Sequence, residues 1–158
     1  EGIQPSSAVE IDNTPPNCFA IVSDPPSPTN KETVDFTFNF DEPVRSGDIE
    51  MADLTISTTG TVFYTTPTLT IATSPETTQC MLRIEGIAGE GLLIAGLTGG
   101  VTIRDLAGNP LGSTVPPLEV ELVGVSPLRE SRRPRPTPTS SSSECRSAKR
   151  SSMSTATT

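Results

Sequence analysis

Residues 33–40 read TVDFTFNF, and this stretch decides the fold. Its apolar side chains, Val34, Phe36, Phe38 and Phe40, alternate strictly with polar ones. A strand with a period of two has one buried and one solvated face, as in an antiparallel sheet that packs on one side only. Because three of the five phenylalanines of the chain lie here, we predict that this stretch forms the central strand of the core.

The same alternation predicts strands at 79–85 and 118–123, and weaker apolar patterns predict others. The residues expected to point inward are Cys80, Leu82 and Ile84 in the first strand and Leu118, Val120 and Leu122 in the second. The weaker strands are expected at 17–23, 54–57, 61–64, 92–95 and 101–104.

Clusters of Pro, Gly, Asn and Asp separate these segments, and no window has the i, i+3, i+4, i+7 pattern of an amphipathic helix. We therefore predict an all-β fold, an immunoglobulin-like β-sandwich of seven to eight short antiparallel strands. The alternative, a small closed barrel, would require more even strand lengths and fewer proline-rich corners.

The chain has 158 residues and a net charge of −8, which is unevenly distributed. Up to Pro127, four basic residues stand against seventeen acidic ones, a net charge of −13. From Leu128 onward, seven basic residues stand against two acidic ones, a net charge of +5. Residues 129–158 contain no Leu, Ile, Val, Phe or Tyr and cannot bury enough apolar surface to fold. We predict a sandwich domain at 12–127 and a disordered Ser/Thr/Pro/Arg-rich tail at 128–158.

The tail has four interpretations: a linker, sequence foreign to the domain, a basic arm for anionic surfaces, or an O-glycosylated stalk. Its basic residues are not interleaved with aromatic ones, so no specific nucleic-acid partner is predicted. Residues 1–11 are interpreted as a stub or linker. Val9-Glu10-Ile11 resembles Val120-Glu121-Leu122. Two interpretations stay open: the match is a coincidence, or the stub is the last strand of a preceding repeat.

The composition excludes several kinds of site. The sequence contains no His, which removes Ser-His-Asp hydrolysis, Cys-His proteolysis, His-ligated zinc and the two-His-one-carboxylate iron site. It contains no Trp, and only 4% of its residues are aromatic. No apolar run approaches the roughly 18–20 residues of a membrane span. No enzyme activity is therefore predicted.

Five short motifs in order resemble the bacterial Ig-like repeats of large cell-surface and adhesin-type proteins. The resemblance covers roughly 12–125 and implies the same sandwich fold. Its motifs are the DNTPP junction at 12–16, the SPTN turn at 27–30, FDEPV at 40–44, DLTI at 53–56 and the DLAGN turn at 105–109. The sequence departs from the family pattern in the long connection at 65–78, the Gly-rich insert at 97–100 and the basic tail.

Three cysteines leave at least one unpaired within the chain. Cys18 and Cys80 have a spacing near that of the antibody-type disulfide, but that bridge joins other strands and packs on a Trp. If the strand at 33–40 lies between theirs, the two cysteines are about 9–10 Å apart, more than a disulfide spans. Two interpretations stay open: a Cys18–Cys80 disulfide, or two buried thiols that act as small apolar side chains.

The surplus of acidic residues at turns suggests a weak calcium site, with possible ligands at Asp12, Asp24, Asp41, Glu42, Asp48, Asp53, Asp105 and Asn109. We expect its ligands to be Asp105 and Asn109, together with a junction acid such as Asp12 or Asp24, because Ca²⁺ takes six to eight oxygen ligands. The other interpretation is that these side chains cap turns and keep the surface charged. No resident cofactor is expected apart from this calcium.

The resemblance implies a non-catalytic repeat module of an extracellular or cell-surface protein. Such a module is a structural spacer or adhesion unit, and its partners are the neighbouring repeats of a tandem array. Two alternatives remain: the loops at 65–78 or 97–100 bind a surface glycan or protein, or the domain accompanies the catalytic domain of a larger secreted enzyme.

Overall fold

The computed structural model describes residues 11–126. The predictions for the stub up to residue 10, for the tail from Leu128 and for Cys145 lie outside the described residues. The domain boundaries of the sequence analysis therefore stay predictions. Within the described part there are eight strands and two short 3-10 turns, and no helix there is long and apolar enough to cross a membrane.

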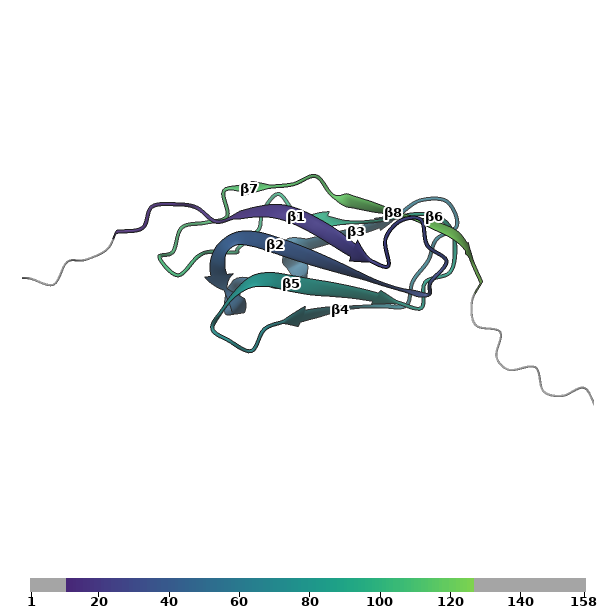
Figure 1. Cartoon of the computed structure of the whole chain (residues 1–158), viewed down its shortest axis with the longest axis horizontal. Helices are drawn as coiled ribbons and strands as arrows, with labels where there is room; N and C mark the ends of the chain where they lie inside the picture. The colour runs from purple at the N-terminus through teal and green to yellow at the C-terminus, as the bar shows by residue number, and fades with distance from the viewer. Residues whose placement is uncertain (1–10, 127–158) are drawn as a thin grey trace, which may run out of the picture. The chain divides into compact units, whose positions relative to one another are not determined.

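Five strands form one sheet in the order β4-β5-β2-β1-β7 (Figure 1). The long strand β2 lies at its centre, antiparallel to β1 on one side and to β5 on the other. Short β7 pairs with the start of β1 in a parallel direction, so the predicted antiparallel pairing holds for every pair but this one. The bounds are β1 Asn17–Asp24, β2 Thr33–Arg45, β4 Thr66–Ile71, β5 Glu76–Glu85 and β7 Ser113–Thr114.

The second sheet has three strands in the order β3-β6-β8, and the 3-10 turns η1 and η2 join β2 to it. Setting β7 aside, the two sheets have the strand orders of a constant-type immunoglobulin domain, which confirms the predicted sandwich. The bounds are β3 Leu54–Thr58, β6 Gly89–Leu97, β8 Leu118–Val125, η1 Ser46–Asp48 and η2 Met51–Asp53.

The predicted central strand is confirmed. Val34, Phe36, Phe38 and Phe40 of β2 are all buried, at most 3% exposed, and their polar neighbours lie on the other face. Because β2 has a partner strand on each side, its apolar face lies in the middle of the core between the two sheets. The partners in this core come from both sheets: Cys80, Leu82 and Ile84 of β5, Leu93 and Ala95 of β6, and Val120 and Leu122 of β8.

Two predicted strands are absent from the structure. At 61–64 only Phe63 forms a bridge, with Ala88, although Thr61 is also hydrogen-bonded to Glu90. Gly89 adopts a φ of +100° opposite Thr61, and a Cβ there would collide with the Thr61 carbonyl. This irregular glycine-lined pairing replaces a ladder. At 101–104 there is one isolated bridge, between Arg104 and Pro110, and only single backbone hydrogen bonds besides it.

One predicted loop is largely a strand. The connection at 65–78 contains β4, which pairs along most of its length with β5 as the edge of the larger sheet. Its sequence TPTLTI has few apolar residues and includes Pro67, which argues against a central strand but is tolerated at an edge. The two-residue β7 carried no sequence signal at all.

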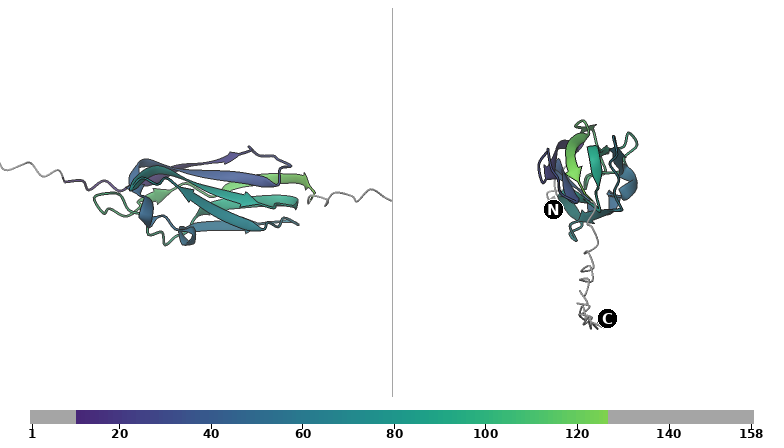
Figure 2. Two further views of the ribbon diagram at one scale, coloured as in Figure 1. Left: turned by 90° about the horizontal axis from the view of Figure 1, so that it is seen from below. Right: turned by 90° about the vertical axis from the view of Figure 1, so that its right-hand side faces the viewer.

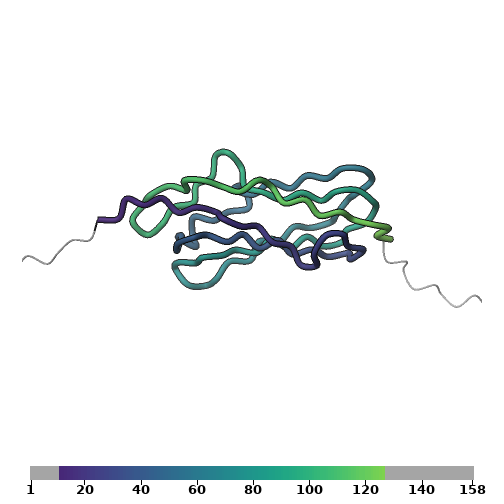
Figure 3. Tube along the Cα trace, turned by 45° about the horizontal axis from the view of Figure 1, so that its top comes forward, coloured from purple at the N-terminus to yellow at the C-terminus, as the bar shows by residue number. Residues whose placement is uncertain are grey.

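The chain enters and leaves the sandwich at opposite ends (Figures 2 and 3). We call the end that contains Ile11 and the turn at 105–109 the N-terminal pole, and the end at which Val125 leaves β8 the C-terminal pole. Near the C-terminal pole, the β1–β2 connection is hydrogen-bonded to β8. The N–H of Thr29 donates to Glu121 O at 2.9 Å, and the Thr29 carbonyl oxygen accepts a hydrogen bond from Val123 N at 2.9 Å.

Candidate functional site

The turn at 105–109 is anchored to the end of β2. Asp105 forms an isolated bridge with Val44, and the N–H of Arg45 donates to Arg104 O at 2.8 Å. The turn closes on itself, because Asp105 N donates to Asn109 O at 3.1 Å. Gly108 has a φ of +100°, a conformation that L side chains rarely adopt, which explains the glycine at this position.

The carboxylate of Asp105 is the centre of this turn. Its Oδ1 accepts the backbone N–H groups of Gly108 and Asn109 at 2.6 and 2.7 Å, and its Oδ2 accepts the side-chain amide of Asn109 at 2.8 Å. Asp105 is only 2% exposed. Burial raises the pKa of Asp105, but the hydrogen bonds from Asn109 and Gly108 outweigh it and hold that pKa below its ordinary value.

Asn109 ties this turn to the segment before β1. Its amide nitrogen also lies 3.1 Å from Asp12 O and 3.3 Å from Thr14 O, as a donor to both. The structure therefore brings together three of the predicted calcium residues, Asp105, Asn109 and Asp12. Asp24 is not among them, because it ends β1, whose eight residues span roughly 25 Å.

A third acid lies at this place, Glu42, which the sequence analysis named only in the wider list of possible calcium ligands. Carboxylate oxygens of Asp12, Glu42 and Asp105 all lie within 4.8 Å of one another, and we call these three residues the acid cluster. Asp12 is exposed, Glu42 is half-buried and Asp105 is buried. Burial and the neighbouring charges of Asp12, Asp105 and Asp41 raise the pKa of Glu42 above its ordinary value. No local sequence pattern singles Glu42 out from the other acids of that list.

A cation at the acid cluster would have to share several oxygens that already have partners. Both Asp105 oxygens accept hydrogen bonds within the turn, and Asp12 Oδ1 accepts the Thr14 N–H at 2.9 Å. The Asp12 and Thr14 carbonyl oxygens accept from Asn109. The role of Asp105 that the structure shows is therefore that of a turn cap, and calcium binding stays a prediction.

Two arginines lie beside this turn but bind its backbone. Arg45 Nη2 donates to Leu106 O at 2.9 Å, and Arg104 Nη1 donates to Gly108 O at 3.1 Å. Among residues 11–126 the ion pair is Arg83–Asp35, at 2.7 Å, on the outer face of the larger sheet. The charge of the acid cluster is thus not neutralised by an ion pair within the described chain.

Cys18 and Cys80 are both free and buried. They lie on β1 and β5, with β2 between, as Cys18 pairs with Phe40 and Cys80 with Phe38. The disulfide is not formed in the structure, and the two thiols fill the core as small apolar groups. Burial, with smaller contributions from Cys18 and Asp53, raises the pKa of Cys80 to about 12, so that this thiol is protonated at neutral pH.

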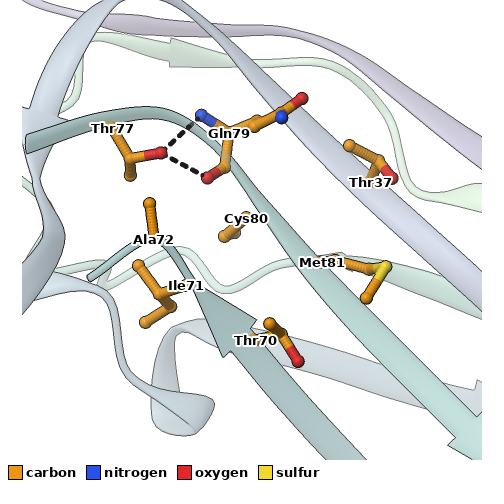
Figure 4. A pocket seen from close by; sticks show the side chains of 8 residues that line it. All are labelled: Thr37, Thr70, Ile71, Ala72, Thr77, Gln79, Cys80 and Met81. Carbon is orange, nitrogen blue, oxygen red and sulfur yellow. Dashed lines mark hydrogen bonds between the residues drawn. The ribbon is translucent and has the colours of Figure 1, made fainter. Parts of the chain in front are cut away.

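A shallow hollow lies on the larger sheet, over β5 and the end of β4 (Figure 4). Its wall is uncharged, and Thr77 Oγ1 both accepts from Gln79 N at 3.2 Å and donates to Gln79 O at 2.7 Å. No side chain in it is a charged acid or base, so it lacks the groups of a hydrolytic site. It is lined by Thr37, Thr70, Ile71, Ala72, Thr77, Gln79, Cys80 and Met81.

Comparison with known proteins does not identify the chain. No family model, no curated protein and no solved structure matches it. The strand order of the two sheets shows the fold alone, so the resemblance to bacterial Ig-like repeats rests on the motifs of the sequence and stays a prediction.

Proposed function

We propose that this domain is a non-catalytic structural spacer or adhesion unit, joined in series with similar units in an extracellular or cell-surface protein. The observation that carries the proposal is the position of the two ends of the described chain. Ile11 lies at the N-terminal pole and Ser126 follows β8 at the C-terminal pole (Figure 3). Units joined at such ends follow one another lengthwise, so each unit adds its own length to the array.

The composition of the sites supports a non-catalytic role. The acid cluster is built from turn-capping hydrogen bonds, and the hollow of Figure 4 has no charged group. The loop-binding alternative is weakened, because most of the proposed loop at 65–78 is the strand β4 and its turn to β5. The insert at 97–100 has two exposed glycines, and no atom lies within 4 Å of where a Cβ of either would stand, so the insert gives a ligand little to contact.

The test joins two copies of residues 1–127 in tandem and measures the maximum dimension by small-angle X-ray scattering. A single strand such as the thirteen-residue β2 spans roughly 40 Å. We expect the tandem to exceed the single copy by about that length. A tandem whose maximum dimension barely grows, because the copies fold back on each other, contradicts the spacer role.

A further inference from the structure

Two of the four edge strands of the sandwich are made by one uncharged segment. Residues 54–75 contain no Asp, Glu, Lys or Arg, the longest such stretch of the chain. This segment builds β3, the edge of the smaller sheet, and β4, the edge of the larger one. We call these two strands the neutral edge. The opposite side of the sandwich is partly closed, since β7 pairs with β1 and Thr29 is hydrogen-bonded to β8.

Natural sheets protect their edges with charges, prolines or bulges, because an unpaired strand edge offers donors and acceptors to any other extended chain. β4 has one such protection, Pro67, which removes a backbone donor. β3 has none: it reads LTIST, and its pairing with β6 is regular from Leu54 to Thr58. β3 is therefore the unprotected strand of the neutral edge.

The hydrogen bonds of β3 show which backbone groups are free. Thr98 N donates to Asp53 O at 2.8 Å and Thr59 N donates to Leu92 O at 2.9 Å, so that the odd-numbered residues face β6. Leu54, Ile56 and Thr58 direct their backbone groups to the other side. On that side, Leu54 N donates to Met51 O in the η2 turn. The other outward backbone groups of β3 pair with no strand of residues 11–126.

We propose that β3 is a self-association edge, which pairs antiparallel with β3 of a second copy about a two-fold axis at Ile56. Ile56 of each copy would exchange both backbone bonds with the other, and each Thr58 N–H would meet a Leu54 carbonyl. The register places Thr55 opposite Ser57 on the outer face, so no like charges face each other although the domain is acidic. The two smaller sheets would then form one continuous six-stranded sheet.

A second copy is the occupant that the chemistry of this edge fits best. A two-fold interface needs a surface that is complementary to itself, and a short uncharged strand with alternating donors and acceptors has this property. A charged peptide would find no charged partner along 54–75. Five residues provide only a small interface, so we expect association at high protein concentration. This proposal does not depend on the spacer role.

The test is sedimentation equilibrium of the full chain over a concentration series, with a reductant present to exclude disulfide dimers through Cys145. We expect the average mass of the wild type to rise from 16.6 kDa toward twice that value. The double variant Thr55→Lys/Ser57→Lys places lysines opposite each other across the axis, and we expect association to weaken at least tenfold. Thr68→Lys/Thr70→Lys adds the same charge to exposed positions of β4 and should behave like the wild type.

Residue-resolved amide exchange provides a second measurement. In the wild type, exchange at Ile56 and Thr58 should slow as concentration rises, whereas Thr55 and Ser57 already donate to β6 and should not change. Both variants must give the circular dichroism spectrum of the wild type. A wild type that stays monomeric at every concentration, an equal loss in the β4 control, or an unchanged Thr55→Lys/Ser57→Lys variant overturns the proposal.

Discussion

Asn17 and Asp41 are joined by two hydrogen bonds across the start of β1 and the second half of β2. The backbone N–H of Asn17 donates to Asp41 Oδ1 at 2.7 Å, and its side-chain amide donates to Asp41 Oδ2 at 2.9 Å. The side-chain bond and then the backbone bond lower the pKa of Asp41. This pair fixes the start of β1 beside the end of the Phe-rich strand.

We expect Asp41→Ala to lower the free energy of unfolding by about 1 kcal/mol at pH 7, because two exposed hydrogen bonds to a carboxylate are lost. A carboxyl with a depressed folded pKa stabilises the fold above its unfolded pKa, and this contribution disappears as pH falls through the folded pKa. The difference from the wild type, measured by urea unfolding, should therefore shrink as pH falls through the lowered folded pKa of Asp41. Asp24→Ala, which removes an acid from the far end of β1, is the control and should cost less.

The core strand gives a second prediction. Phe38 is fully buried and Thr37 lies on the outer face, so Phe38→Ala should cost about 3–5 kcal/mol and Thr37→Ala well under about 1 kcal/mol. The first value is a large share of the stability of a domain of this size. Chemical denaturation of both variants checks it, and equal losses would mean that the two faces of β2 are wrongly assigned.

Two acids of the acid cluster should affect stability in opposite directions. At neutral pH, Asp105→Ala is expected to lower the melting temperature, because Gly108 and Asn109 lose their acceptor. Glu42→Gln is expected to raise it, since a carboxyl with a raised folded pKa destabilises the fold when charged.

The pH dependence of these two variants separates charge from packing. The folded form of Glu42 binds its proton more tightly, so the gain from Glu42→Gln should vanish as pH falls below the unfolded pKa of a glutamate. The loss from Asp105→Ala should shrink only at lower pH, when the depressed folded pKa of Asp105 is passed. Thermal melts between neutral pH and acid measure both. A Glu42→Gln variant that is less stable than the wild type at pH 7 contradicts the assigned repulsion.

Calcium should do little to the isolated chain. A site specific to the folded state would stabilise it by about 2.7 kcal/mol at a hundredfold excess over the Kd. Because the oxygens of Asp105 already accept hydrogen bonds, we expect millimolar Ca²⁺ to raise the melting temperature no more than Mg²⁺ or Na⁺ at matched ionic strength. If Ca²⁺ instead raises the melting temperature more than the matched salts do, and Asp12→Asn removes this extra rise, the acid cluster binds the ion.

The sequence predicts those strands whose burial follows a period of two. β2, β5 and β8 alternate clearly because one face of each packs on the core, and all three were found. β4 could not be found in the same way, because it is a threonine-rich edge strand with exposed and half-buried residues. The segment at 61–64 alternates like a strand, but its glycine-lined partner prevents a regular ladder.

The candidate site was partly predictable for a similar reason. Asp105 and Asn109 lie four residues apart, so a local turn motif indicates their contact. Glu42 joins them only because the end of β2 lies beside the turn, a relation across 63 residues that no local pattern encodes. The separation of Cys18 and Cys80 could be inferred, since it needs only the order of three neighbouring strands.

The hydrogen bonds between Thr29 and β8 have a consequence for how the domain would respond to a pulling force. If the two ends of the chain are pulled apart, β1 and β8 are drawn in opposite directions, and both the parallel β1–β7 pairing and the Thr29–β8 hydrogen bonds oppose this movement. Thr29 and Leu122 pair in parallel, so these bonds lie across the direction of the force and are sheared together. Ser27 Oγ, which accepts the Glu121 N–H at 2.9 Å, adds a third bond to the group. Resistance to extension thus depends on these short parallel pairings at the two poles as well as on the Phe-rich core.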